Sequence, residues 1–204
     1  MWVPIALGRD VPRGATRAVL LEGEELVVWR GEAGTVQVWE DRCPHRGMRL
    51  SFGFVRGDAL NCLYHGWEYG AGASCRRIPA HPDLTVPPTI RAKAFAATET
   101  GGLILVDRDG TGGPPPLMLA GLPVASLAIA ADPETLFQLV PATPRPDPQL
   151  VEATLDGVRF HLGWHVPGPG RIMLHALVLD PGAESRALIA LHKLRSEAEA
   201  RRAA

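Results

Sequence analysis

Short apolar runs separated by glycine-containing turns dominate the first half of the chain. Apolar stretches occupy residues 18–21 and 26–29, and residues 36–38 alternate between apolar and polar. Runs of this length, bounded by turn residues, are typical of short antiparallel strands. Residues 95–106 predict a closing hairpin, because a Gly-Gly pair separates two more apolar runs. The pattern therefore predicts a small antiparallel sheet that ends near Asp107.

The segment from residue 41 to residue 79 breaks this pattern. It lacks hydrophobic periodicity and is rich in Cys, His, Gly and Arg. Such a composition is typical of functional loops carried by a rigid scaffold. Further along, residues 108–116 are rich in glycine and end in consecutive prolines, which favours a linker. We therefore expect a first domain at residues 1–107 and a small C-terminal domain at residues 117–204.

Alternation returns in the C-terminal part. Between residues 158 and 166 the apolar positions share one strand face and the histidines share the other, which predicts a half-buried strand. Residues 172–179 and 187–191 predict two more strands, joined by an Asp-Pro-Gly turn. The tail at residues 196–204 has helix propensity but no apolar face, so we expect it to fray.

The composition supports a mainly β fold. Of 204 residues, 22 are glycine and 19 are proline, which favours turns and short strands over long helices. The net charge of −1, without a concentrated basic stretch, argues against nucleic acid and anionic membranes as partners. No apolar run reaches about 18 residues and no secretory signal is evident, so we expect a soluble, cytoplasmic protein without a membrane partner.

The chemistry-bearing residues of the central segment form an ordered pattern. Cys43 and His45 are followed, after 16 intervening residues, by Cys62 and His65. An odd number of cysteines without an export signal favours metal or redox chemistry over disulfides. Two loops that each offer one thiolate and one imidazole supply the donors for a [2Fe-2S] cluster with two histidine ligands. A Cys2His2 zinc site is the alternative, although zinc sites usually pair their ligands by type.

This pattern and its surroundings resemble the Rieske family. Residues 43–47 (CPHRG) and 64–67 (YHGW) are similar to the two cluster-binding loops of Rieske oxygenases, the ring-hydroxylating and O-demethylase alpha subunits. Residues 77–80 (RIPA) are similar to the next segment of those proteins. The resemblance covers roughly residues 3–107 and implies a Rieske-type antiparallel β domain.

The resemblance assigns roles by position. It implies that Cys43 and Cys62 hold the buried iron and that His45 and His65 hold the outer iron, which faces the electron partner. It also implies a supporting set around these ligands, comprising Arg46, Gly47, Tyr64, Gly66 and Trp67. The two glycines are expected to let backbone amides approach the cluster sulfurs. The remaining cysteine, Cys75, is either a redox-sensitive thiol or a small buried side chain.

Differences from the Rieske proteins of respiratory cytochrome bc complexes indicate which branch of the family the sequence resembles. Those proteins usually carry an extra cysteine in each loop, joined as a disulfide, and a serine after the second His-Gly pair. The matching positions are Met48, Tyr64 and Trp67. The resemblance therefore implies the oxygenase and ferredoxin branch, with a reduction potential near the lower end of the Rieske range, roughly −150 mV.

The C-terminal part raises the question of a second metal. Rieske oxygenases carry a larger helix-grip domain whose mononuclear iron is bound by two histidines and a carboxylate. The nearest candidates are Asp156, His161 and His165, but residues four apart on a strand lie about 13 Å from each other, too far for one ion. We interpret the histidines as polar-face residues of a sheet, a set that comprises His161, His165, His175 and His192. The C-terminal part is then a β-rich, α+β segment that resembles a shortened piece of the helix-grip domain.

These observations favour an oxidoreductase component that passes single electrons between a reductase or ferredoxin and an acceptor oxygenase. A compact Rieske non-haem iron monooxygenase or demethylase, with iron in the C-terminal part, is the first alternative. A redox-sensing or structural subunit is the second. Arg46, Arg76 and Arg77 either steer an acidic redox partner or are simply solvated. The resemblance is also compatible with a homotrimer, which the sequence leaves open.

Overall fold

The computed structural model describes residues 1–114, 120–140, 142–144 and 149–202. Contacts divide the chain into two compact units. The loop unit contains residues 10–20 and 24–97, and the C-terminal unit contains residues 1–9, 21–23 and those from Thr98 onward. The boundary expected at residues 108–116 falls partly on residues outside the described ranges and stays a prediction.

Strands are the main regular elements of both units, so the prediction of a mainly β fold is confirmed. The expected strands of the first half are present, as is the predicted pair around Gly101. Two elements carry that pair, β9 (Ala94–Thr100) and β10 (Leu103–Asp107). Within the described ranges, no helix combines the length and the apolar character needed to cross a membrane.

The loop unit is built from two groups of antiparallel strands. The first group pairs β4 with β3 and with the start of β9, and its remaining members are β2 (Thr16–Leu21), β3 (Glu24–Arg30) and β4 (Val36–Glu40). The second group forms a sheet in the order of the chain, made of β5 (Phe54–Arg56), β6 (Ala59–Asn61), β7 (Glu68–Gly70) and β8 (Cys75–Arg77). Short 3-10 helices lie at Gly8–Asp10, at Leu50–Phe52 before β5, and at Ala71–Ala73 after β7.

One apolar core holds the loop unit together. Trp29 and Trp39 are buried and meet edge to face, with ring centroids 5.0 Å apart. Tyr69 of β7 extends this group, and the cysteines 43, 62 and 75 belong to the same core. The two loops that carry the Cys and His residues of the sequence pattern are therefore anchored by their cysteines in a packed interior.

The C-terminal unit combines a strand pair with a five-stranded sheet. The pair joins β1 (Trp2–Leu7) to β10, with Trp2 opposite Asp107. The sheet runs in the order β11-β15-β14-β13-β12, with the bounds Leu122–Ile129, Arg171–Val178, Val158–Gly168, Leu150–Leu155 and Ala142–Pro144. A short helix, α1 (Pro133–Phe137), and a long one, α2 (Glu184–Arg202), complete the unit.

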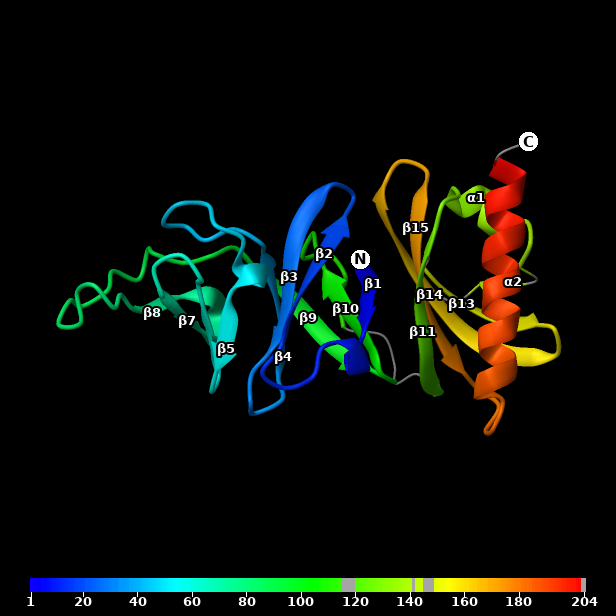
Figure 1. The fold of residues 1–204 in the computed structure, drawn as a ribbon, viewed down its shortest axis with the longest axis horizontal. Coiled ribbons are helices and arrows are strands. Elements are labelled where there is room, and N and C mark those ends of the chain that lie inside the picture. Colours follow the sequence, from blue (N-terminus) through cyan, green and yellow to red (C-terminus); the bar gives the residue numbers. More distant parts are fainter. Residues whose placement is uncertain (115–119, 141, 145–148, 203–204) are drawn as a thin grey trace. The chain divides into compact units, whose positions relative to one another are not determined.

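The long C-terminal helix corrects two predictions. The sequence predicts a strand at residues 187–191 and a frayed tail at residues 196–204. Residues 187–191 and 196–202 instead belong to α2, which lies against the sheet (Figure 1), and residues 203–204 lie outside the described ranges. The cause is a helical stripe of small and apolar side chains that are buried on the sheet, namely Ala187, Ala190, Leu191, Leu194 and Ala198. A stripe with this spacing stabilises a helix through packing. It is mostly alanine, so its apolar character is weak in the sequence.

The prediction that β14 exposes a polar face is also wrong. His161, His165 and His175 are all buried, with at most 6% of their surface exposed. The reason is that β1 packs on this face: a side-chain carbon at Gly163 would meet Pro4 at 2.8 Å. The strand is covered by α2 on one side and by β1 on the other. His192 lies on α2 rather than on the sheet, and it is exposed.

Candidate functional site

Two loops of the loop unit share one hydrogen-bond pattern. The Cys43 amide donates to the Met48 carbonyl at 2.8 Å, and the Cys62 amide donates to the Trp67 carbonyl at 2.9 Å. In each loop a glycine four residues after the cysteine donates back to the cysteine carbonyl, at 2.8 and 2.9 Å. These glycines, Gly47 and Gly66, have φ values of +72° and +66°. Only glycine adopts this backbone without strain, so the sequence sets the shape of both loops.

The paired loops bring like donors together. Cys43 and Cys62 are each 2% exposed and interact with each other, while the rings of His45 and His65 have centroids 4.8 Å apart. His45 is half-buried and His65 is exposed. The site thus has an inner pair of thiols and an outer pair of imidazoles.

The surroundings of the cysteine thiols shift their pKa values. Burial raises the pKa of the Cys62 thiol, and the nearby Cys43 adds to the rise. The backbone amides of Tyr64 and His65 hydrogen-bond to the Cys62 sulfur and oppose this rise, because they stabilise a thiolate. Burial also raises the pKa of Cys75. Partial burial, the His65 ring and the Arg46 charge together lower the pKa of His45.

A buried tyrosine, absent from the sequence-based set, contacts the inner pair. Tyr69 Oη lies 3.1 Å from Cys43 Sγ, and burial together with this contact raises the pKa of the Tyr69 hydroxyl. The hydroxyl therefore keeps its proton and is the donor whenever Cys43 is a thiolate. Its ring meets Trp39 edge to face at 6.5 Å. The available signal was an aromatic residue shortly after the second loop, but its contact with the first loop depends on tertiary structure.

Aromatic rings cover both imidazoles. Trp67 stacks on His45 with centroids 4.2 Å apart and planes inclined by 6°. Tyr64 stacks on His65 at 3.8 Å with planes inclined by 30°. Of the predicted supporting set, Trp67 and Tyr64 thus contact the histidines directly, whereas Gly47 and Gly66 shape the loops. Arg46 is exposed beside His45.

The donor set divides into two pairs of like side chains, two thiols and two imidazoles. A [2Fe-2S] cluster with two histidine ligands takes its protein ligands as two such pairs, one for each iron. The thiol pair and the imidazole pair match that arrangement, and the amide donors to the Cys62 sulfur suit an anionic ligand.

The iron candidates of the C-terminal unit have separate partners. Asp156 lies in the turn between β13 and β14, and its carboxylate accepts a hydrogen bond from Lys193 at 3.0 Å. His161 Nδ1 is 2.9 Å from the Ala120 carbonyl oxygen. His165 Nδ1 lies 3.1 Å from the Pro4 carbonyl oxygen and 3.2 Å from His175 Nε2.

Comparison with known proteins identifies the part of the chain that carries the two loops. A family model described as the Rieske [2Fe-2S] domain matches residues 1–88. Residues 1–88 are a Rieske [2Fe-2S] domain. Membership of these residues in the Rieske family agrees with the paired loops and implies a [2Fe-2S] cluster as the cofactor.

Curated relatives resemble this Rieske domain and its flanks. Oxidoreductase NdmD of Pseudomonas putida is 42% identical over 104 residues, which are 50% of this chain and 18% of that protein. The oxygenase component of 3-ketosteroid-9-alpha-monooxygenase from Rhodococcus rhodochrous is 33% identical, over 56% of this chain and 29% of its own length. The chain therefore spans less than a third of these relatives. The Rieske domain is of the oxygenase alpha-subunit type, as its resemblance implied.

Solved structures extend the likeness in fold to the C-terminal unit. NdmA of Pseudomonas putida CBB5 superimposes with a TM-score of 0.77 at 18% identity, over 98% of this chain and 79% of that one. Dicamba monooxygenase gives a TM-score of 0.70 at 17% identity, over 92% and 78% of the two chains. Likeness at this identity concerns the fold. It confirms a Rieske β domain followed by a β-rich segment with one long helix.

Proposed function

We propose that the chain passes single electrons in an oxygenase-like redox system, through a [2Fe-2S] cluster held by Cys43, His45, Cys62 and His65. The observation that carries the proposal is the pair of loops with one hydrogen-bond pattern, each offering one thiol and one imidazole. The match to the Rieske domain supports the presence of the cluster. The relatives named as oxygenase components support a role in an oxygenase-like redox system.

The two donor pairs have different tasks. When bound, the cluster supplies a site that takes up and releases one electron. The buried thiols, Cys43 and Cys62, would hold the inner iron away from water. The outer imidazoles, His45 and His65, would hold the other iron near the surface, where a partner protein can approach. Stacking by Trp67 and Tyr64 fixes the planes of these rings and limits their rearrangement.

The test is iron and acid-labile sulfide per chain, with an EPR spectrum of the dithionite-reduced protein. Two irons, two sulfides and a Rieske signal are expected. Cys62→Ser is expected to abolish the signal, because a serine hydroxyl is a poor substitute for thiolate. Cys75→Ser is the matched control, since Cys75 is also buried but lies outside the paired loops, and it is expected to retain the cluster. Zinc without sulfide would refute the proposal.

A compact monooxygenase or demethylase is a second candidate, favoured by the fold match to NdmA and dicamba monooxygenase across 92–98% of the chain. It requires a mononuclear iron in the C-terminal unit. Anaerobic addition of Fe(II) distinguishes the two proposals. Stable uptake of a third iron, lost in His161→Ala, would establish the second candidate, whereas two irons per chain before and after addition support the electron carrier.

A further inference from the structure

The two loops of the candidate site are closed differently at their bases. The second loop, residues 62–67, joins two strands that pair with each other, with Asn61 of β6 opposite Glu68 of β7. Such pairing holds the two ends of a loop in register through backbone hydrogen bonds. The first loop, residues 42–49, instead runs from β4 to the short 3-10 helix at Leu50–Phe52. Its exit is a helical turn, so another link has to join its two ends.

Asp41, at the entry of the first loop, is linked to Ser51, at its exit. One oxygen of the Asp41 carboxylate accepts a hydrogen bond from the Ser51 backbone amide, and the other accepts one from the Ser51 hydroxyl, both at 2.6 Å. The Ser51 carbonyl oxygen accepts a hydrogen bond from the Thr16 hydroxyl at 2.9 Å, so each polar group of Ser51 has a partner. We call the two hydrogen bonds between Asp41 and Ser51 the loop clamp.

Burial makes the loop clamp selective for the closed loop. Asp41 is 2% exposed, and a carboxylate removed from water is stable only when hydrogen bonds replace its hydration. Hydrogen bonds to an ionised acceptor are about twice as strong as those between neutral groups. Opening the loop would separate Ser51 from Asp41 and leave the buried carboxylate without these donors. The carboxylate therefore favours the closed form of the loop over open forms.

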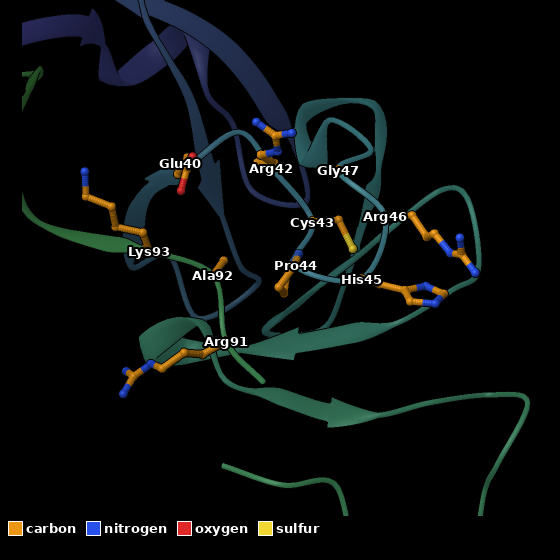
Figure 2. A pocket seen from close by; sticks show the side chains of 10 residues that line it. All are labelled: Glu40, Arg42, Cys43, Pro44, His45, Arg46, Gly47, Arg91, Ala92 and Lys93. Carbon is orange, nitrogen blue, oxygen red and sulfur yellow. The ribbon is translucent and has the colours of Figure 1, made fainter. Parts of the chain in front are cut away.

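The first loop depends on such a link because packing supports it on only part of its surface. An open cavity of about 320 Å³ lies beside it, and Figure 2 shows side chains between Glu40 and Gly47 around that cavity. Further lining residues come from the segment 91–93. A side chain that borders open space lacks the contacts that a packed interior supplies. The positions of Cys43 and His45 therefore depend strongly on how the ends of their loop are held.

The exit of the first loop also meets the entry of the second. Gly53 follows Ser51 by two residues, and a side-chain carbon at Gly53 would lie 2.2 Å from the carbonyl oxygen of Asn61. Only glycine allows so close an approach. Asn61 in turn directly precedes Cys62. The loop clamp thus sets the place of the first loop relative to the thiol of the second.

We propose that Asp41 is a positioning residue of the cluster site. Through the loop clamp it holds the thiol and the imidazole of the first loop at the spacing from those of the second that a [2Fe-2S] cluster requires, within the roughly 0.5 Å that preorganised sites need. The inference rests on the proposed function and adds Asp41 and Ser51 to the residues that the sequence pattern indicated. The loop clamp consists of protein atoms alone, so it can be measured with and without a cluster.

The first measurement is hydrogen exchange by mass spectrometry in the full chain, freed of cluster and kept reduced. Asp41→Ala removes both acceptors of the loop clamp, Ser51→Ala removes one donor, and Ser51→Thr keeps both donors. Asp58→Ala is the matched control, since the Asp58 carboxylate also accepts a backbone hydrogen bond, from Ala33 at 2.8 Å, but lies outside both loops. Peptides from the first loop are compared with peptides from the second.

Ser51→Ala is expected to speed amide exchange in the first loop about tenfold, and Asp41→Ala about ten- to hundredfold, because hydrogen bonds to a charged group are lost. The second loop is expected to stay within about twofold of wild type. Ser51→Thr is expected to match wild type, and so is Asp58→Ala in both loops. If Asp41→Ala does not fold, Ser51→Ala still gives the decisive comparison.

The second measurement is the rate at which a ferrous chelator removes iron from the loaded, dithionite-reduced chain. Ser51→Ala is expected to lose iron about tenfold faster than wild type and to show a broader Rieske EPR signal, because the ligands of the first loop are held less tightly. Ser51→Thr is expected to restore both properties. Leu191→Ala removes a buried side chain from the C-terminal unit and is expected to change neither, so a general loss of stability gives a different result.

Several results would overturn the inference. Equal acceleration of exchange in both loops would make Asp41 a general stabiliser of the loop unit, and wild-type exchange rates in Ser51→Ala and Asp41→Ala would refute the loop clamp. Selective acceleration with an unchanged rate of iron release would refute its role in positioning the ligands. A wild-type chain that binds no cluster would refute the proposed function, whereas the exchange data would still test the loop clamp.

Discussion

Replacing Tyr69 by phenylalanine tests the one hydroxyl that contacts the inner thiol pair. The substitution removes an oxygen that lies 3.1 Å from Cys43 Sγ and leaves the ring in its buried place against Trp39. With a cluster bound, Cys43 is a thiolate and the hydroxyl donates to it. Reduction adds negative charge to the cluster and its sulfurs, so this hydrogen bond strengthens in the reduced state. Its loss therefore lowers the reduction potential.

The expected size follows from the energy of one hydrogen bond. A hydrogen bond to a charged acceptor contributes about 1.5–3 kcal/mol, and only the part that grows on reduction changes the potential. Taking that part as about 1 kcal/mol gives a decrease of about 40 mV, because 1.36 kcal/mol corresponds to about 59 mV for one electron. EPR-monitored redox titration resolves such a shift.

Tyr64→Phe is the matched control, since Tyr64 is the other of the two tyrosines in the chain. Its ring stacks on His65 and its side chain is exposed, so removal of its hydroxyl is expected to leave the potential within about 10 mV. Equal potentials for Tyr69→Phe and wild type would refute the reasoning. An increase in the potential would also contradict donation from the Tyr69 hydroxyl to the Cys43 thiolate.

Three further predictions concern the ligands and the C-terminal unit. His65→Cys is expected to keep a cluster but to lower its potential by on the order of 100 mV, because thiolate adds negative charge, and an unchanged potential in redox titration would remove His65 from the ligand set. Leu191→Ala is expected to cost about 2–5 kcal/mol in urea unfolding, since Leu191 is fully buried on α2, whereas the Rieske EPR signal stays unchanged. Asp180 accepts hydrogen bonds from the backbone and guanidinium of Arg159, which lower the pKa of its carboxyl below 3.8. A carboxyl whose pKa is lower in the folded than in the unfolded state stabilises the fold at pH values above its unfolded-state pKa. This contribution is lost as the pH falls through the folded-state pKa. Asp180→Asn is therefore expected to lower the melting temperature at pH 7, by less than Leu191→Ala, and to match wild type well below pH 3.8. If the melting temperatures of Asp180→Asn and wild type differ by the same amount at pH 7 and at the acidic pH, the ionised Asp180 carboxylate is not the source of the stability.

The two loops of the candidate site could be predicted from the sequence, but the contacts between distant segments could not. The two loops are specified by residues close in the chain, since Cys43 and Gly47, or Cys62 and Gly66, close each loop through their own hydrogen bonds. The contact of Tyr69 with Cys43 depends on how β7 packs beside the first loop. Neighbouring residues give no sign of that packing.

In the C-terminal unit, the errors have a common physical origin. A short apolar run such as residues 187–191 fits a strand or a helix, and only the longer stripe of α2 distinguishes them. Alternation in β14 indicates a strand correctly, but its polar face is covered by β1, whose packing partner is remote in sequence. Histidines suit such a place because their ring nitrogens find partners, as between His165 and the Pro4 carbonyl oxygen.

The membership of β1 in the C-terminal unit has a consequence for synthesis on the ribosome. All residues of the loop unit have been synthesised once Ala97 is in the chain. β1 is buried at all six of its positions in the finished fold, yet its partner β10 and the covering strand β14 are made later. At about 5–20 residues per second, this first strand stays without its partners for several seconds. The nascent chain thus exposes an apolar strand edge until its own C-terminal half arrives, which makes β1 the segment for a chaperone to protect.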